Sequence, residues 1–333
     1  MSCAYLAFTE RGLALAQQLA AACPGPVARC GAGGPGLDEW TAAQFAAPDA
    51  LIYIGAVGIA VRAIAPYCRS KAADPAVVVL DECGRFAVPL LSGHLGGANA
   101  LARRLAAVCG AVPVITTATD LHGLFAVDEW AKRQGCIVAE PERIKQVSGA
   151  LLAGKCVHFT ADWPIQGTPP AGVQPAAGGC ADFALTLTPT GQALHIVPRI
   201  AVLGIGCRRG TTAEHLETAF AAFCRESGLA PQGVATAASI DLKREEPGLA
   251  AFCRDHGWSM DFYTAAQLRA VPGSFTASGF VTSVTGVDNV CERAAVLASG
   301  GTLLLPKWAR DGVTFAAALR PFAPDWRWRD DEP

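Results

Sequence analysis

The stretch VPLLSGHLGGANALARRLAAVCGAVPVITTATD, from Val88 to Asp120, carries residues whose types and spacing could do chemistry. An apolar run stops at Ser92, and a glycine-rich turn then presents His94 just before an alanine-rich helical pattern. An imidazole at the end of a strand can transfer protons near neutral pH. His94 is therefore a candidate general base or acid, and the alternative is an ordinary hydrogen-bonded loop histidine.

The glycines of this turn could let the backbone approach a ligand. Gly93, Gly96 and Gly97 lie between Ser92 and Asn99, where the first N–H groups of the following helix could stabilise an oxyanion. The alternative is that these glycines only allow the strand and the helix to pack. The spacing fits neither a dinucleotide loop nor a phosphate loop, and G-x-S-x-G is absent.

The segment TTATD ends the next apolar run and should lie at the same edge of the sheet. Asp120 could orient His94, and Thr117 could hold a substrate hydroxyl. Equally, Asp120 could cap a helix that starts near His122.

A third loop, in YIGAVGIAVRAIAP, opens a helix with Arg62 in its first turns. The guanidinium could pair with a ligand carboxylate, or it could belong to a solvated helix face. We expect the three loops to converge if their strands are neighbours.

The segment GIGCRRGTT begins a further strand–loop–helix unit. Its glycine spacing, G-x-G-x-x-x-G, argues against a nicotinamide site, whereas Arg208 and Arg209 suit an anionic group. Cys207 has no evident histidine partner and is interpreted as a structural thiol. Further on, Glu292 and Lys307 could line a groove, or they could lie on solvated faces.

Composition excludes several classes of partner. The 333 residues carry a formal charge of −2, which predicts no nucleic acid and no membrane as partner. None of the 13 cysteines forms a C-x-x-C pair and no H-x-x-x-H occurs, so we expect reduced thiols and no protein-built metal site. The N-terminus lacks the features of a signal peptide, and a cytoplasmic location is expected.

Short apolar runs alternate with helical patterns along most of the chain, which predicts an α/β fold. Among them, AVVVLDECGRFAVPLL predicts a hairpin that turns through Glu82–Gly84, and a helix is expected over Val127–Gln134. We expect two α/β lobes with parallel or mixed sheets covered by helices, joined by the Pro/Gly-rich residues 162–179. The expected parts are an N-terminal α/β domain (1–125), a middle region with this linker (126–198), a C-terminal α/β domain (199–322) and a loosely held tail (323–333).

Several long motifs occur together and resemble one family. They are LLSGHLGGANALARRLA with PVITTATD, GAVGIAVRAIAP, GIGCRRGT, SIDLKREEPGL, VTGVDNVCERAAVL and LLLPKWARDGVTFA. Over roughly Leu51 to Ala318 the chain is similar to the cobalt-precorrin 5A hydrolase family of anaerobic cobalamin biosynthesis. The C-terminal part also resembles a small stand-alone protein associated with the aerobic pathway.

The resemblance implies a hydrolytic reaction on a cobalt-tetrapyrrole substrate. The ring A acetate lactone at C20 is opened, and C20 leaves with its methyl group as acetaldehyde to give cobalt-precorrin 5B. Water is then the reactant, cobalt arrives within the substrate, no cofactor is protein-bound, and neighbouring pathway enzymes are expected partners.

For that reaction, His94 is our candidate for proton transfer, with Asp120 orienting it and the amides of Gly96–Asn99 receiving the oxyanion. Arg62, Arg208, Arg209 and Lys307 are candidates to bind the peripheral carboxylates. The alternatives are a non-catalytic tetrapyrrole carrier and, less compatible with the motif spacing, a nucleotide-binding enzyme.

Overall fold

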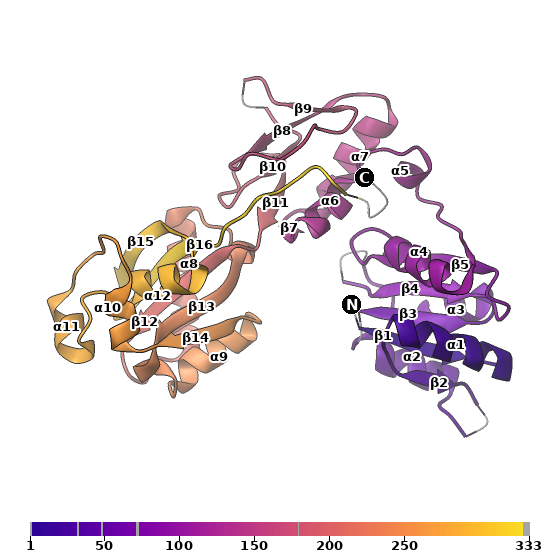
Figure 1. Ribbon diagram of the computed structural model, residues 1–333, viewed down its shortest axis with the longest axis horizontal. Helices are drawn as coiled ribbons and strands as arrows, with labels where there is room; N and C mark the ends of the chain where they lie inside the picture. Colours follow the sequence, from indigo (N-terminus) through magenta and orange to yellow (C-terminus); the bar gives the residue numbers. More distant parts are fainter. Residues whose placement is uncertain (1, 32, 48, 71–72, 179, 329–333) are drawn as a thin grey trace. The chain divides into compact units, whose positions relative to one another are not determined.

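Three β-sheets covered by helices make up the protein, as the computed structural model in Figure 1 shows. The structure describes residues 2–31, 33–47, 49–70, 73–178 and 180–328. The chain divides into two compact units, Met1–Trp130 and Ala131–Pro333, and the second unit holds two of the sheets. The predicted α/β class with parallel and mixed sheets covered by helices is confirmed, and the sheets are three in number.

The sheet of the N-terminal unit has the strand order β2-β1-β3-β4-β5-β6. Its strands are β1 (Cys3–Ala7), β2 (Val27–Arg29), β3 (Ala50–Ile54), β4 (Ala76–Leu80), β5 (Phe86–Leu91) and β6 (Val112–Pro113). Every residue of β1, β3 and β4 is buried, as expected for apolar strands covered on both faces.

Helices cover both faces of this sheet. They are α1 (Glu10–Ala22), α2 (Leu37–Phe45), α3 (Val57–Ile64) and α4 (Ala98–Cys109). Two short helices follow in the chain, α5 (Ala118–Leu121) and α6 (Val127–Arg133). Leu19 of α1 and Leu105 of α4 join the core on one face, whereas Trp40 of α2 and Ile64 of α3 join the core on the other.

Strand β5 reverses the direction of the sheet. It pairs antiparallel with β4 through the hairpin predicted from the sequence, and β6 then pairs parallel with β5. Consequently β5 and β6 end at the edge where β1, β3 and β4 begin. The hydroxyl of Ser92, directly after β5, donates to the carbonyl of Asp74 just before β4, at 2.9 Å.

The middle sheet opens the second unit, with the order β7-β11-β10-β8-β9. Its elements are β7 (Cys136–Val138), the 3-10 helix Pro141–Arg143, α7 (Ile144–Leu152), β8 (Val157–Ala161), β9 (Val173–Pro175), β10 (Phe183–Leu185) and β11 (Leu194–Pro198). Strand β9 lies inside the Pro/Gly-rich segment and pairs with β8, so Val173–Pro175 of this segment belong to the middle sheet.

The third sheet has the order β14-β13-β12-β16-β15. The strands are β12 (Ala201–Cys207), β13 (Val234–Ile240), β14 (Ser259–Tyr263), β15 (Thr302–Arg310) and β16 (Val313–Leu319). The helices are α8 (Ala213–Ser227), α9 (Pro247–Asp255), α10 (Ala265–Ala270), α11 (Gly279–Thr285) and α12 (Cys291–Ser299), with 3-10 turns at Pro231–Gly233 and Asp241–Lys243. Phe220 of α8 and Phe252 of α9 fill one core, and Leu268 of α10 and Ala294 of α12 fill another.

The C-terminal segment is held more firmly than expected over its described part. Trp326 is buried and its ring meets Phe159 edge to face, while Asp325 is hydrogen-bonded to Gln134. Residues 329–333 of the expected tail lie outside the described residues. Among the described helices, none has the length and apolarity that crossing a bilayer requires.

Candidate functional site

The backbone conformation of the loop after β5 depends on several of its residues. Ser92 has a left-handed φ of 56°, and its hydroxyl is buried on Asp74. A Cβ on Gly96 would lie 2.3 Å from the Ser92 Cβ, and one on Gly93 would lie 2.8 Å from the Asn99 amide oxygen. Glycine is therefore required here for close packing, and the Ser92 hydroxyl is engaged within the protein instead of facing a ligand.

His94 lies at the centre of a cluster of carboxylates, all within the N-terminal unit. Its Nε2 is 2.9 Å from Asp120 Oδ2 and 3.7 Å from Glu129 Oε1, and its Nδ1 is 3.4 Å from Asp128 Oδ2. The side chains are largely buried, with 17% of His94, 3% of Asp120 and 13% of Glu129 exposed. The imidazole is thus sandwiched between acidic groups on both of its nitrogens.

Asp120 is the best-connected member of the cluster. Besides His94, its carboxylate accepts hydrogen bonds from Asn99 Nδ2 (3.1 Å), from Arg103 (2.6 Å) and from the Thr117 hydroxyl. Asn99 also donates to Thr117 at 3.0 Å. Asp120 lies inside α5, which begins at Ala118, so it does not cap a helix starting near His122. The sequence-based alternative in which it contacts His94 is the one that the geometry supports.

The electrostatics follow from this arrangement. Burial alone lowers the pKa of His94, but hydrogen bonds to Asp120 and Asp128 and the charges of Asp128 and Glu129 outweigh it and raise the pKa to about 10. Burial raises the pKa of Asp120, yet its bonds from His94, Thr117 and Arg103 hold that pKa below its usual range. Burial, with the charges of Asp120 and Asp128, raises the pKa of Glu129 even though His94 opposes this.

These shifts alter the chemistry expected of His94. With both ring nitrogens protonated, the imidazolium can donate a proton but has no lone pair with which to accept one. The general-base role expected from the sequence therefore requires that one ring nitrogen first lose its proton. His94, Asp120 and Glu129 each also offer one ligand atom within 4.8 Å of the others, so this trio could hold a metal ion.

Three members of the cluster were not anticipated from the sequence. Asp128 and Glu129 lie in the first turn of α6, in the segment FAVDEW, whose pattern predicted only a helix of the middle region. Arg103 lies four residues after Asn99, on the same face of α4. The signal that could have identified them is the short chain distance from Asp120 to the adjacent acidic pair.

The amides at the start of α4 are only partly available to an oxyanion. The N–H of Ala98 donates to Ser92 O and that of Asn99 donates to Gly93 O. In the described part of the chain, the amides of Gly96 and Gly97 have no such partner. The expected donor set Gly96–Asn99 therefore reduces to its two glycines.

The expected convergence of three loops is wrong. The loop with Gly55 and Arg62 follows β3, which is antiparallel to β5, so it lies at the opposite edge of the sheet from His94. Arg62 is exposed, and among the described residues its guanidinium donates only to Gly58 O, at 3.3 Å. The 116–120 segment does share the His94 edge because β6 runs parallel to β5.

The remaining candidates lie around the third sheet. Arg208 and Arg209 are exposed in the loop between β12 and α8, and Lys307 is half-buried in β15. Glu292 is 1% exposed, and its two oxygens accept four hydrogen bonds, from the backbone and hydroxyl of Thr276, from Asn289 and from the Lys307 amide. Glu292 therefore ties three segments together and does not line a groove. Burial raises the pKa of the Cys207 thiol, in keeping with a structural role.

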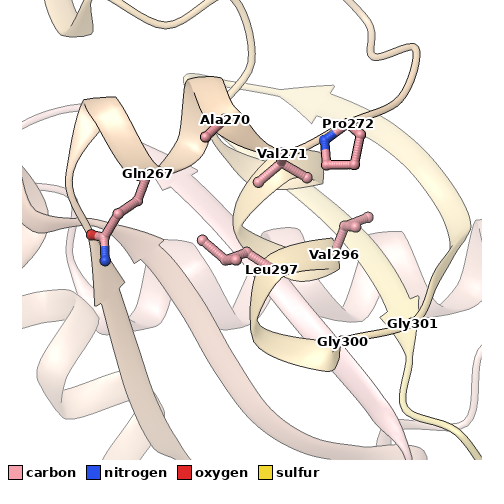
Figure 2. Close-up of a pocket in the computed structure, with 8 residues that line it drawn as sticks. All are labelled: Gln267, Ala270, Val271, Pro272, Val296, Leu297, Gly300 and Gly301. Atoms are coloured by element: carbon pink, nitrogen blue, oxygen red, sulfur yellow. The ribbon is translucent and has the colours of Figure 1, made fainter.

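A mostly apolar pocket of about 340 Å³ lies between α10 and the end of α12 (Figure 2). Val271, Pro272, Val296 and Leu297 supply much of its wall. None of the residues singled out from the sequence lines it, and it holds no titratable group.

Fold and site together define an α/β protein with a buried acid–base cluster on its first sheet. Three family models match the chain: Cobalamin synthesis G N-terminal over residues 39–120, Cobalamin biosynthesis central region over 125–177, and Cobalamin synthesis G C-terminus over 201–318. The chain belongs to this cobalamin synthesis G family, as the sequence motifs indicated.

Two relatives named cobalt-precorrin-5A hydrolase are similar to this protein over most of the chain. It is 36% identical over 293 residues to the cobalt-precorrin-5A hydrolase of Salmonella typhimurium, which covers 83% of each protein. It is 32% identical over 301 residues to the cobalt-precorrin-5A hydrolase of Priestia megaterium, covering 84% of this chain and 80% of that one. A third relative, Protein CobE of a Sinorhizobium species, is 33% identical over 105 residues, which are 31% of this chain and 68% of that protein.

Proposed function

We propose that this protein is a cobalt-precorrin-5A hydrolase of cobalamin biosynthesis. The observation that carries the proposal is its identity of 36% and 32% to two proteins of that name, over more than four fifths of the chain. A tetrapyrrole intermediate that carries cobalt is accordingly the substrate. Its own cobalt ion arrives with it, and water is the second reactant.

The chemistry expected of the family is opening of the ring A acetate lactone and release of acetaldehyde. Opening the lactone requires an activated water, a group to stabilise the oxyanion, and a proton for the departing ring oxygen. Releasing acetaldehyde then requires removal of the proton from the new hydroxyl as the carbon–carbon bond breaks. Apart from stabilisation of the oxyanion, each of these requirements is a proton transfer to or from an oxygen atom.

His94 is the residue on which we propose that these proton transfers depend, and Asp120 holds its ring in place. The 2.9 Å contact between His94 Nε2 and Asp120 Oδ2, whose side chains are 17% and 3% exposed, supports this pairing. The amides of Gly96 and Gly97 are the proposed oxyanion donors. Thr117 and Asn99, expected from the sequence to contact the substrate, hold Asp120 instead.

Arg62, Arg208, Arg209 and Lys307 remain our candidates for the substrate's acetate and propionate groups. Within the described ranges, none of the four side chains has an acidic partner within 4.0 Å, which leaves their charges available. A guanidinium that is not already paired can bind a carboxylate through two parallel hydrogen bonds. We also propose a cytoplasmic location, which the reduced state expected of the thiols supports, and contacts with neighbouring pathway enzymes.

Acetaldehyde release distinguishes an enzyme from a carrier. The purified protein is incubated with cobalt-precorrin 5A, and acetaldehyde is followed by coupled reduction with an alcohol dehydrogenase. Catalytic release, many molecules per protein chain, supports the proposal. Tight binding of the tetrapyrrole without any release would instead establish the carrier alternative.

A further inference from the structure

We propose that His94, Asp120 and Glu129 form a binding site for a divalent metal ion, and that this ion activates the water that opens the lactone. Binding of the ion is independent of the proposed function, whereas its use in the reaction rests on that function. In the loaded site His94 Nε2 is a ligand, and the ion takes the place of the proton that this nitrogen otherwise carries. His94 then acts through the ion, and a carboxylate of the cluster takes over the proton transfer of lactone opening.

The three ligand atoms have the spacing that one ion requires. They lie within 4.8 Å of one another, with Nε2 at 2.9 Å from Asp120 Oδ2 and 3.7 Å from Glu129 Oε1. Imidazole and carboxylate ligands bind such ions at about 2.0–2.2 Å, so neighbouring ligands around one ion lie roughly 3.0–3.6 Å apart. The separations of 2.9 and 3.7 Å are within about 0.1 Å of that range, whereas Asp120 and Glu129, which lie within 4.8 Å of each other, would approach by up to about 1.2 Å. Positions not taken by the protein are then available to water.

The groups behind these ligands also match a metal site. A metal-bound histidine almost always donates its other ring N–H to a carboxylate or carbonyl, which fixes the ring. Here Nδ1 of His94 faces Asp128 Oδ2 at 3.4 Å. Asp120 is fixed in turn by Asn99 and Arg103. Two of the three proposed ligands are thus already oriented.

A separate observation points to a bound group at this place. Asp128 is only 4% exposed, and its second oxygen, Oδ1, has no hydrogen-bond partner among the residues that the structure describes. A buried carboxylate oxygen without a donor is costly, and such orphans in native proteins often mark an ion or an ordered water. The Glu129 side chain accepts no hydrogen bond from the described residues, and it lies 3.7 Å from His94 Nε2. In the proposed site the ion binds Glu129, and a water ordered by the ion donates to Asp128 Oδ1.

The charges of the cluster favour a dication. Asp120, Asp128 and Glu129 carry three negative charges when ionised, and Arg103 supplies one positive charge at 2.6 Å from Asp120. With His94 neutral, as a ligand must be, two negative charges remain, which one divalent ion balances. Because the side chains of these acids are 3–13% exposed, solvent screens this imbalance poorly.

The proposed step conserves atoms and charge. Water on the ion passes one proton to a carboxylate of the cluster, and its oxygen adds to the carbonyl carbon of the lactone. The bond from that carbon to the ring oxygen then breaks, and the ring oxygen takes the proton. The products are one carboxylic acid and one hydroxyl, the sum of lactone and water. Lowering the pKa of bound water is the established contribution of such ions.

Mn²⁺ is the probe of choice for this chain. One imidazole with carboxylates suits Mn²⁺, whereas the thirteen free cysteines would also bind Zn²⁺ elsewhere. Metal is first removed with a chelator, which is dialysed away so that it never meets the substrate's cobalt. Binding is then measured by loss of the electron paramagnetic resonance signal of free Mn²⁺.

We expect one Mn²⁺ to bind per chain. His94→Ala and the isosteric Glu129→Gln should each weaken binding at least tenfold, and Asp128→Asn about 10- to 100-fold. His158→Ala, at a histidine that also faces a carboxylate but is 44% exposed, should bind as the wild type does. Circular dichroism confirms that each variant is folded. Mn²⁺ binding that is absent, or equal in Glu129→Gln and wild type, overturns the site.

Activity separates this inference from the proposed function. Metal-depleted protein should release acetaldehyde at least tenfold more slowly and recover with Mn²⁺. Undiminished release after depletion would overturn the metal's role while the hydrolase assignment stands. Site-specific Mn²⁺ binding in a protein that never releases acetaldehyde would contradict the assignment while the site stands.

Discussion

Asp120→Asn tests whether one carboxylate holds the candidate site together. Four side chains donate to Asp120, whose own side chain is 3% exposed: His94, Asn99, Arg103 and Thr117. Asparagine keeps one acceptor oxygen but replaces the other with an NH₂ donor. Whichever way the amide turns, it faces either Arg103 or the other three donors. One or more hydrogen bonds to a charged group, each worth about 1.5–3 kcal/mol, are therefore lost.

The total cost should approach that of breaking a buried ion pair, about 3–5 kcal/mol, because both His94 and Arg103 lose their counter-charge. Urea unfolding can be followed by the fluorescence of Trp40 and Trp130, which are buried in the same unit. Glu39→Gln, which removes an exposed carboxylate on α2, should cost less than about 1 kcal/mol. If the free energy of unfolding of Asp120→Asn is within about 1 kcal/mol of the wild-type value, Asp120 does not hold the candidate site together.

Three further outcomes test other parts of the account. Glu292→Gln should lower the free energy of unfolding of the second unit in urea by about 3–5 kcal/mol, because four donors converge on the two buried oxygens of Glu292. A decrease of less than about 1 kcal/mol would contradict that role. Burial raises the pKa of Tyr53 from 10.0 to about 12, so stability present below pH 10 should be lost as the pH rises toward 12, by roughly 3 kcal/mol. Tyr53→Phe should remove that part of the alkaline loss, and an unchanged pH profile would refute it. A thiol reagent applied to the native protein at about pH 8 should modify the exposed cysteines Cys68, Cys83, Cys156 and Cys180. Burial raises the pKa of three other cysteines to about 12, so these should react only on unfolding: Cys136, Cys224 and Cys253. Rapid labelling of those three in the native protein would contradict the packing.

Local patterns in the sequence were sufficient to predict many elements of the fold. The alternation of apolar runs and helical stretches predicted the α/β class, and the turn after Leu80 predicted the β4–β5 hairpin. Local patterns do not show at which edge of the sheet the residues that follow this hairpin lie. The antiparallel β5 carries His94 away from Arg62, and only the pairing of β5 with β4 and β6 reveals this.

The part of the site that could be predicted from the sequence is the pair of reactive side chains that follow neighbouring strands. His94 follows β5, and Asp120 lies in α5, which follows the parallel neighbour β6, so their place at one edge of the sheet could be predicted from the sequence. Asp128 and Glu129 were missed because the helix that starts at Val127 was predicted from its apolar residues alone. Its acidic residues were not considered as partners of His94. Glu292 was misjudged for the opposite reason. A charged residue is usually exposed, and the donors that bury this one come from distant segments.

Acetaldehyde release by His94→Ala is the most direct test of the central claim, which is that this cluster is where the lactone is opened. His158→Ala, at an exposed histidine beside Asp182, serves as the matched control. We expect His94→Ala to release acetaldehyde at least about 100-fold more slowly while binding the tetrapyrrole within a few fold of wild type. Release by a folded His94→Ala protein at a rate near that of the control would show that the reaction takes place without this cluster.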